Sequence, residues 1–406
     1  MHRVELTFWW WGEDEAPGLG RWVDSVCAGF ERRTGTVVRT RLLRHDEVIP
    51  GFPGAAAADA APDLHFFWNG IYLVENVWRG YLAPLDELLE PEEIRAFGGG
   101  PQSTVDGACY RVGWYAIPVV WVANRALLDE VPRTWAGCED AAARLRERGR
   151  SLLAAGDGEG DLSVWWLTHF LTQQVDEAAD APRLALGELD WSDARYRRPW
   201  ELLAHARANG WFDDATLALT LWHGLHRFTA GEAALTLASG PMFAACRDRL
   251  GDAATVLTAP RAGDGPLAGL PIVDTQGIGI SSTSRRKELA AELLRYMHEP
   301  EQLRSLWEQT RQFPADRRWD AQGVEDPDYR RLWEWFAQGP NAPYLPNLLP
   351  LDLHFRVGVD VGRAVLAGTL DPTAAGLEAS AQARAWREGT DTRAYAAWAF
   401  AAAAAA

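Results

Sequence analysis

The hydrophobic and polar positions of the chain follow two periods, that of a β-strand and that of an α-helix. Residues 4–8 alternate and are rich in strand-forming side chains, which predicts a first strand. Apolar residues then recur at helical spacing over residues 22–30, with Thr34-Gly35 as the stop, and residues 36–42 predict a second strand. This order predicts a parallel sheet with a right-handed crossover connection.

The same alternation continues downstream. A third strand is predicted at residues 61–67, a helix at residues 71–79, a turn at residues 109–118 and an apolar strand at residues 119–124. The chain has 406 residues, which exceeds the usual size of one hydrophobic core. We therefore expect two lobes of the α/β class.

Tryptophans gather where the predicted strands end. Three consecutive ones, residues 9–11, follow the first strand and precede an acidic run at residues 13–15, and Trp68 follows the third strand. Indoles combine a large apolar face with one N–H donor. One interpretation is a stacking surface at the carboxyl edge of the sheet, where open α/β sheets bind ligands. The alternative is that these side chains simply pack against the sheet end.

Composition narrows the choice of partners. The chain has 40 Lys and Arg against 56 Asp and Glu, a net charge of -16, so we expect neither nucleic acid nor an anionic membrane as a partner. It has 21 Trp against 9 Tyr and 3 Met, an excess that suits a protein stacking on flat, partly apolar ligands such as sugar rings, although large cores also use Trp. No dinucleotide, phosphate-loop or hydrolase motif is present, and we expect no cofactor.

The cysteines and the chain ends add little. The four cysteines lie far apart without a metal-binding spacing, so free thiols and a disulfide both remain open. Residues 1–3 lead straight into a strand without a secretory apolar segment, which leaves a cytoplasmic protein or one whose export signal has been removed. The alanines at residues 401–406 are taken as a tail without information on the fold.

A resemblance to a known family follows from the order of several phrases. These are the Pro-Asp-Leu strand at residues 62–64, the DGACYRVGWYAIP turn ending at Pro118, the strand ending in Asn124, and Pro132-Arg133-Thr134-Trp135. Residues 222–240 and 277–298 continue it. This order resembles the extracellular solute-binding proteins of carbohydrate ABC importers. Each phrase is weak alone, and their agreement over the whole length carries the resemblance.

The resemblance implies a two-lobed periplasmic binding protein fold. Each lobe would be a mostly parallel sheet flanked by helices, with hinge crossings between them and closure on a captured ligand. We expect residues 1–119 and 277–312 in the first lobe, and residues 120–276 and 313–400 in the second. It also implies a sugar receptor without enzymatic activity. Its partners would be a carbohydrate and the membrane permease subunits of an importer, and it would be an extracytoplasmic monomer.

Candidate ligand-binding residues are those at loops and strand ends that match the family's motif. Trp10, Trp11 and Glu15 come from the opening, with Glu13 as a substitute for Glu15. The further candidates are Trp68, Asn69, Tyr115, Trp166, Trp222, Ser239, Gly240, Gln276, Gln312 and Asn347. For the helical tryptophans, packing in the core is an equal or better interpretation.

Two other functions stay open at this point. Residues 13–15 with Asp63 could form the carboxylate pair of a glycosidase, and a receptor of the same fold could bind a polyamine or peptide. His223 and His226 lie three apart on one helix, but no third metal ligand is evident, and we expect no metal.

Overall fold

The computed structural model describes residues 4–404, which divide into two compact units. Unit 1 comprises Met1–Ile117 and Asp274–Glu325, and unit 2 comprises Pro118–Val273 and Asp326–Ala406. The chain passes between them within strand β6, within strand β10, and at Glu325-Asp326.

Unit 1 is an α/β unit built on a five-stranded arrangement. Its sheet has the order β2-β1-β3-β10-β6, in which β1 is parallel to β2 and β3, and β10 is antiparallel to β3. Its strands are β1 (Glu5–Trp10), β2 (Val37–Leu42), β3 (Leu64–Phe67), β4 (Thr104–Val105), β5 (Ala108–Cys109) and parts of β6 (Val112–Asn124) and β10 (Ile272–Ile280). Its helices are α1 (Leu19–Thr34), α2 (Val48–Ala57), α3 (Ile71–Trp78), α4 (Pro91–Ala96), α11 (Lys287–Met297) and α12 (Pro300–Thr310).

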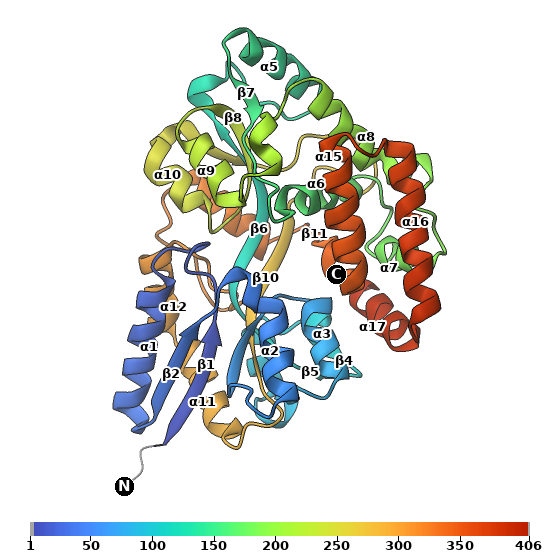
Figure 1. Cartoon of the computed structure of the whole chain (residues 1–406). Helices are drawn as coiled ribbons and strands as arrows, with labels where there is room; N and C mark the ends of the chain where they lie inside the picture. The colour runs from blue at the N-terminus through green and yellow to red at the C-terminus, as the bar shows by residue number, and fades with distance from the viewer. Residues whose placement is uncertain (1–3, 405–406) are drawn as a thin grey trace. The chain divides into compact units, whose positions relative to one another are not determined.

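Side chains of the unit 1 strands point alternately to the two faces of the sheet, and both faces are packed. On one face, the Trp114 ring lies 6.0 Å from Phe8, 6.4 Å from Phe66 and 5.8 Å from Trp22 of α1. Helix α1 packs against α11 and α12 (Figure 1). Because successive side chains of a strand point to opposite faces, a β-strand with helices on both sides is apolar throughout. The predicted parallel opening of the fold is confirmed.

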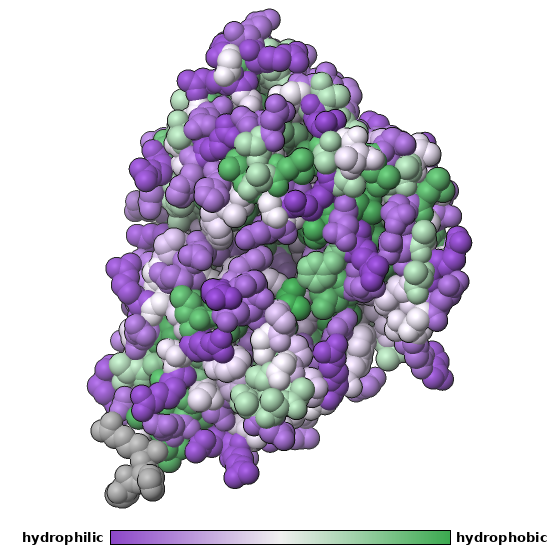
Figure 2. Space-filling view, in the orientation of Figure 1, coloured by the Kyte–Doolittle hydropathy of each residue, from purple (hydrophilic) through white to green (hydrophobic). Residues whose placement is uncertain are grey.

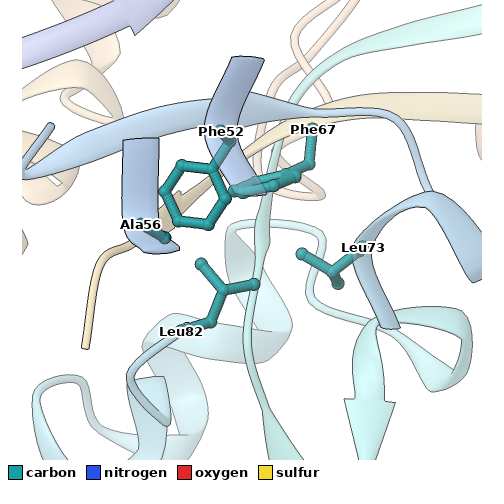
Figure 3. Packing of buried hydrophobic residues seen from close by; sticks show 5 residues of the cluster. All are labelled: Phe52, Ala56, Phe67, Leu73 and Leu82. Atoms are coloured by element: carbon teal, nitrogen blue, oxygen red, sulfur yellow. The ribbon is translucent and has the colours of Figure 1, made fainter. Parts of the chain in front are cut away.

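The opposite face of the unit 1 sheet packs against α2. The rings of Phe52 in α2 and Phe67 in β3 meet edge to face, with centroids 4.9 Å apart and an interplanar angle of 84°. Figure 3 shows the cluster that these rings form with their aliphatic neighbours, which comprises Phe52, Ala56, Phe67, Leu73 and Leu82. This second layer holds β3 in place, and β3 in turn positions the residues that follow it.

Unit 2 is also an α/β unit, with more helices. Strand β6 pairs antiparallel with β8 and β9, β7 pairs parallel with β8, and β10 pairs parallel with β11. Its strands are β7 (Ser151–Leu153), β8 (Ala233–Ser239), β9 (Ala254–Leu257) and β11 (Ala342–Pro343). Its helices are α5 (Trp135–Glu147), α6 (Asp161–Thr172), α7 (Asp180–Leu186), α8 (Ala194–Ala208), α9 (Leu221–Thr229), α10 (Phe243–Leu250), α13 (Pro327–Ala337), α14 (Leu351–Leu353), the π-helix η8 (His354–Val361), α15 (Gly362–Ala367), α16 (Pro372–Gly389) and α17 (Arg393–Ala404).

The predicted α/β class is confirmed, and one detail of it needs refinement. We expected mostly parallel strands in each lobe, which holds for β1, β2 and β3 of unit 1. In unit 2 the long strand β6 enters from unit 1 and runs antiparallel to β8 and β9, whereas β7 is parallel to β8 and β10 is parallel to β11.

The predicted lobes differ from the units mainly at residues 313–325. We placed this segment in the second lobe, but it belongs to unit 1. Its backbone is tied to β6 by hydrogen bonds from the Ala116 N–H to the Phe313 carbonyl (2.9 Å) and from the Ala315 N–H to the Trp114 carbonyl (3.0 Å). Gln276, which we also placed in the second lobe, lies in unit 1 because the crossing within β10 comes three residues earlier than expected.

Two local predictions were wrong. The predicted turn at residues 109–118 is largely strand, and Tyr115 lies within β6, fully buried. Strand β1 runs on through Trp10, because its parallel pairing with β2 extends to the register Trp10 with Leu42. Only the third of the three consecutive indoles therefore follows the strand.

The C-terminal alanines are also part of the fold. Residues 401–404 continue α17, and Ala402 and Ala403 are buried. The prediction that this run carries no structural information is therefore wrong for these four residues, and residues 405–406 lie outside the described part of the chain.

Buried thiols and a polar surface complete the description. All four cysteines are free, with Cys109, Cys138 and Cys246 buried and Cys27 half-buried. Burial raises the pKa of each thiol, to about 12 for Cys27 and about 11 for Cys109. Figure 2 shows hydrophilic residues over most of the visible face. Among residues 4–404, no helix combines the length and the apolar character needed to cross a membrane.

Candidate functional site

An aromatic cluster lies where the three parallel strands of unit 1 end. Trp11 follows β1, His45 follows β2 and Trp68 follows β3, and these ends meet because parallel strands share one carboxyl edge. The Trp11 ring lies 5.7 Å from Trp68 at an interplanar angle of 80° and 5.8 Å from His45, and His45 lies 5.7 Å from Trp68. Tyr72, in the first turn of α3, meets Trp68 at 5.3 Å.

The members of this cluster differ in exposure. Trp11 is 7% exposed and also packs against Phe66 at 5.6 Å, whereas Trp68 and Tyr72 are half-buried and His45 is exposed. Trp11 is therefore the base of the cluster, and Trp68 presents ring surface to solvent. A half-buried indole held by neighbouring rings is suited to stack on an apolar ligand face.

A carboxylate and a phenol lie beside the loop that follows Trp11. The Tyr115 Oη lies 3.4 Å from Oε2 of Glu15, and both residues are buried. Burial, followed by the neighbouring Glu15, raises the pKa of the Tyr115 phenol well above its ordinary value, so it remains a neutral donor. Gly12 has φ 119°, and a Cβ atom at this position would lie 2.5 Å from the Tyr115 Oη. Only glycine fits this turn between the indoles and the acid.

Asn69, directly after Trp68, belongs to a polar network. Its Oδ1 accepts from the Ser103 hydroxyl at 3.0 Å, and its Nδ2 donates to Oδ1 of Asp274 at 3.1 Å. The buried Arg111 guanidinium donates to the Thr275 carbonyl at 2.9 Å, and burial lowers its pKa to about 10. The network fixes the orientation of the half-buried Asn69 amide, which places a polar group next to the Trp68 ring.

The Glu13 carboxylate is hydrogen-bonded to the backbone at the start of α1 rather than open to a ligand. Its carboxylate accepts from the Gly18 N–H at 3.0 Å and from the Gly20 N–H at 2.5 Å, at the start of α1. These backbone donors have no partner within the helix, and a carboxylate there also interacts favourably with the helix dipole. Glu13 thus anchors the indole loop to α1, and we no longer consider it a substitute for Glu15.

Replacing Glu13 with alanine should lower the free energy of unfolding by about 1 kcal/mol, the typical cost of a lost helix cap. Urea unfolding followed by tryptophan fluorescence measures this change. The matched control is Asp14→Ala, since Asp14 is the exposed acid next to it. Equal effects of the two substitutions would contradict the anchoring role of Glu13.

The carboxylates considered for a glycosidase do not form a pair. Oδ2 of Asp63 accepts from the Thr7 N–H at 2.8 Å, and Oδ1 accepts from the Ser284 hydroxyl at 2.6 Å. Asp63 precedes β3, whereas Glu15 follows β1, and the two strands are parallel. The two acids therefore lie toward opposite ends of the sheet, and the Asp63 carboxylate is used to join strands.

Two of the predicted tryptophans lie in cores. Trp10 is 5% exposed and packs against Trp114 at 6.5 Å. Trp166 is 1% exposed, donates its Nε1–H to the Pro199 carbonyl at 2.9 Å, and packs in unit 2 against Trp121 at 6.2 Å. Packing is the better interpretation of both.

The remaining candidates lie in both units. In unit 2, Trp222 is half-buried in α9, Ser239 and Gly240 are buried at the end of β8, and Asn347 is buried near α14. In unit 1, Gln276 is buried in β10, and Gln312 is 2% exposed with its Nε2 donating to the Thr310 carbonyl at 2.9 Å. Their roles in binding stay predictions.

Several residues of the aromatic cluster and the polar network were missed from the sequence. His45 and Tyr72 complete the cluster. Ser103 and Asp274 bind the Asn69 amide, and Arg111 donates to Thr275, the residue after Asp274. His45 could have been found, because it follows the second predicted strand as Trp68 follows the third. Asp274 is 205 positions from Asn69, and no local pattern connects them.

The histidine pair gives no metal site. His223 and His226 are exposed on α9, and Nδ1 of His223 lies 2.8 Å from the Thr220 hydroxyl. Across the described part of the chain, no three His, Cys, Asp or Glu side chains are placed to hold a metal ion.

Comparison with solved structures identifies proteins with the same fold. A chitin oligosaccharide binding protein is 17% identical and superposes with a TM-score of 0.84 over 95% of this chain and 99% of that chain. The bacterial solute receptor AcbH, described with a preference for β-D-galactopyranose, is 16% identical with a TM-score of 0.80 over 96% of this chain and 100% of that chain. At these identities the similarity shows the fold alone, and it is the predicted periplasmic binding protein fold.

Sequence comparison gives the family. A curated relative, the osmoprotective compounds-binding protein GgtB of Synechocystis sp., is 28% identical over 152 residues, and the match spans only 35% of each protein. Residues 25–326, well over half of the chain, match the family described as bacterial extracellular solute-binding protein. The order of phrases noted in the sequence is thus explained by common descent, and the chain belongs to the bacterial extracellular solute-binding protein family.

Proposed function

We propose that this protein is a receptor that captures a mono- or oligosaccharide outside the cytoplasm and delivers it to the permease subunits of an ABC importer. The observation that carries the proposal is the half-buried Trp68 ring, supported by Trp11 and bordered by the fixed amide of Asn69. Sugars present apolar C–H faces and a rim of hydroxyl groups. They therefore bind where an aromatic plane meets hydrogen-bonding groups.

The comparisons support the saccharide class. The chitin oligosaccharide binding protein and AcbH bind sugars by their descriptions, and both share the fold. The family description supports an extracytoplasmic location. The proposed site residues are Trp11, Glu15, Trp68, Asn69 and Tyr115, all in unit 1.

Binding without turnover is part of the proposal. Asp63 and Glu15 lie toward opposite ends of parallel strands, and Glu13 caps α1, so these acids do not supply the carboxylate pair that glycoside hydrolysis requires. Incubation with aryl glycosides should release no phenol. Release that disappears in Glu15→Gln would contradict this part of the proposal.

Isothermal titration calorimetry against a panel of saccharides tests the ligand class. Galactose, glucose, xylobiose, maltose and chitobiose cover monosaccharides and oligosaccharides, and spermidine tests the polyamine alternative. We expect at least one saccharide to bind with a quench or shift of tryptophan fluorescence. If spermidine binds and no saccharide does, the ligand class would be cationic, which would contradict the saccharide proposal.

A further inference from the structure

Unit 2 carries an open hollow lined by basic side chains. Helix α8 contributes Arg195 and Arg198, and the segment after β9 contributes Arg261. The rest of its lining comes from Gln174, Ala194, Ala262, Gly263 and Asp264. The chain has a net charge of -16, so three arginines that face one hollow contrast with the overall charge.

The arginines are held in place by the backbone. Arg195 and Arg198 are three residues apart on α8 and therefore share one face of the helix. The Arg261 backbone is anchored on both sides, because its N–H donates to the Arg133 carbonyl and its carbonyl accepts from the Trp135 N–H, each at 2.9 Å. The backbone at all three arginines is thus held by helix α8 or by these hydrogen bonds.

Part of their donor capacity is unused. All three nitrogens of Arg195 have partners, because its Nε donates to the Gln174 carbonyl and its terminal nitrogens donate to Asp176 at 2.8 and 2.6 Å. Arg198 donates to Glu201 through one terminal nitrogen at 3.0 Å. Arg261 uses only its Nε, which donates to the Gly263 carbonyl at 3.2 Å, and its two terminal nitrogens have no partner among residues 4–404. Arg261 is exposed, so its planar fork is available to a ligand.

Gln174 gives an independent indication. Its side chain is 9% exposed, and its Nε2 has no hydrogen-bond partner within residues 4–404. This nitrogen lies close to Gly263, since a Cβ atom there would approach it to 2.5 Å. The loop that contains Gly263 is held in this position, because Oε1 of Gln173 accepts from the Ala262 and Gly263 N–H groups at 2.7 and 3.1 Å. A buried donor without an acceptor is unfavourable, and an acceptor from a ligand would satisfy it.

We propose that this hollow binds an oxyanion of the carboxylate or phosphate type. The Arg261 guanidinium would donate through its terminal nitrogens, which match the two oxygens of either group, and Gln174 would donate from the buried side. Arg195 and Arg198 would contribute positive potential while they keep their carboxylate partners. Asp264 lies on the exposed rim and limits the affinity. This site is additional to the saccharide surface proposed on unit 1.

Calorimetry on the full chain at constant ionic strength tests the proposal with three probes. Inorganic phosphate represents the tetrahedral anion, glucuronate represents a carboxylate, and glucose is the neutral match of glucuronate. We expect phosphate or glucuronate to bind, and Arg261→Gln to weaken that binding at least tenfold. Gln174→Leu should weaken it severalfold, and Arg249→Gln, an exposed arginine of α10 outside the hollow, should leave it unchanged.

The outcomes distinguish a phosphate ligand from a carboxylate ligand, and they test the anion site separately from the saccharide receptor function. Binding of phosphate alone, or of glucuronate alone, supports the site and identifies the preferred group. Three results would overturn it: no binding of either anion, an equal loss in Arg249→Gln, or binding of glucose that Arg261→Gln weakens as much as that of glucuronate. In the first two of these cases, neutral saccharides that bind normally to Arg261→Gln would leave the proposed receptor function intact, and in the third case the arginines would belong to the saccharide site itself.

Discussion

Replacing Trp68 with alanine should weaken saccharide binding by about 10- to 100-fold, which corresponds to about 1 to 3 kcal/mol. The reason is the position of the ring. Trp68 is half-buried, its neighbours Trp11, His45 and Tyr72 fix its orientation, and one part of its surface remains open. Calorimetric titration with the saccharide that binds best measures the change.

A matched substitution shows whether the loss belongs to the site. Trp78 lies in the last turn of α3, 37% exposed, and Trp78→Ala removes an indole from a helix adjoining the same cluster. Its affinity should stay within a factor of two. We expect Trp11→Ala to weaken binding on the same scale as Trp68→Ala, and also to destabilise unit 1, because Trp11 is the buried base of the cluster. Unchanged affinity in both Trp68→Ala and Trp11→Ala would refute the aromatic surface as the binding site.

Acidification should destabilise the protein strongly between pH 6.5 and pH 3. Burial lowers the pKa of His65 in unit 1 and of His169 in unit 2 from 6.5 to about 3. Below pH 6.5 the unfolded chain binds protons on these imidazoles that the folded chain does not bind. The free energy of unfolding is therefore unaffected by these imidazoles above pH 6.5 and decreases as the pH falls toward 3. At pH 4.5 the decrease is about 3 kcal/mol for each residue.

His65→Phe isolates one of these contributions. The His65 ring lies 4.9 Å from Phe52 and 4.8 Å from Phe67, and neither of its nitrogens has a hydrogen-bond partner in the described part of the chain. Urea unfolding at pH 7.5 and pH 4.5 should show that the variant loses about 2 to 3 kcal/mol less than the natural chain. The control is His226→Gln, which removes an exposed imidazole. A stability difference that does not change with pH would show that His65 is protonated in the folded state.

Local patterns were sufficient where the boundary of an element is set by residues next to it. The helix over residues 22–30 ends where Gly35 takes a left-handed conformation, and Thr134 caps α5 by accepting from the Gly137 N–H at 3.1 Å. Glycine and threonine specify these boundaries through their own backbone and hydroxyl chemistry. The elements that were wrong depended on distant partners. Tyr115 lies in a strand rather than a turn because it pairs with Pro314, which is far away in the sequence.

The candidate site shows the same division. Trp11 and Trp68 could be predicted, because each follows a strand of a parallel sheet and therefore reaches the same edge. Trp10 precedes Trp11 by one position, and the alternation of a strand turns it toward Trp114 in the core. The partner of Asn69 could not be predicted, since Asp274 reaches it only when β10 returns to unit 1. Site residues whose position follows from a single strand can be predicted from the sequence, whereas contacts between strands that are distant in the sequence cannot.

The four free cysteines are distributed evenly, with Cys27 and Cys109 in unit 1 and Cys138 and Cys246 in unit 2. Their high pKa values keep them as protonated thiols, and alkylating reagents attack the thiolate. Iodoacetamide labelling followed by peptide mass spectrometry therefore records separately when each unit opens. The two cysteines of each unit therefore report on the order in which the two units unfold.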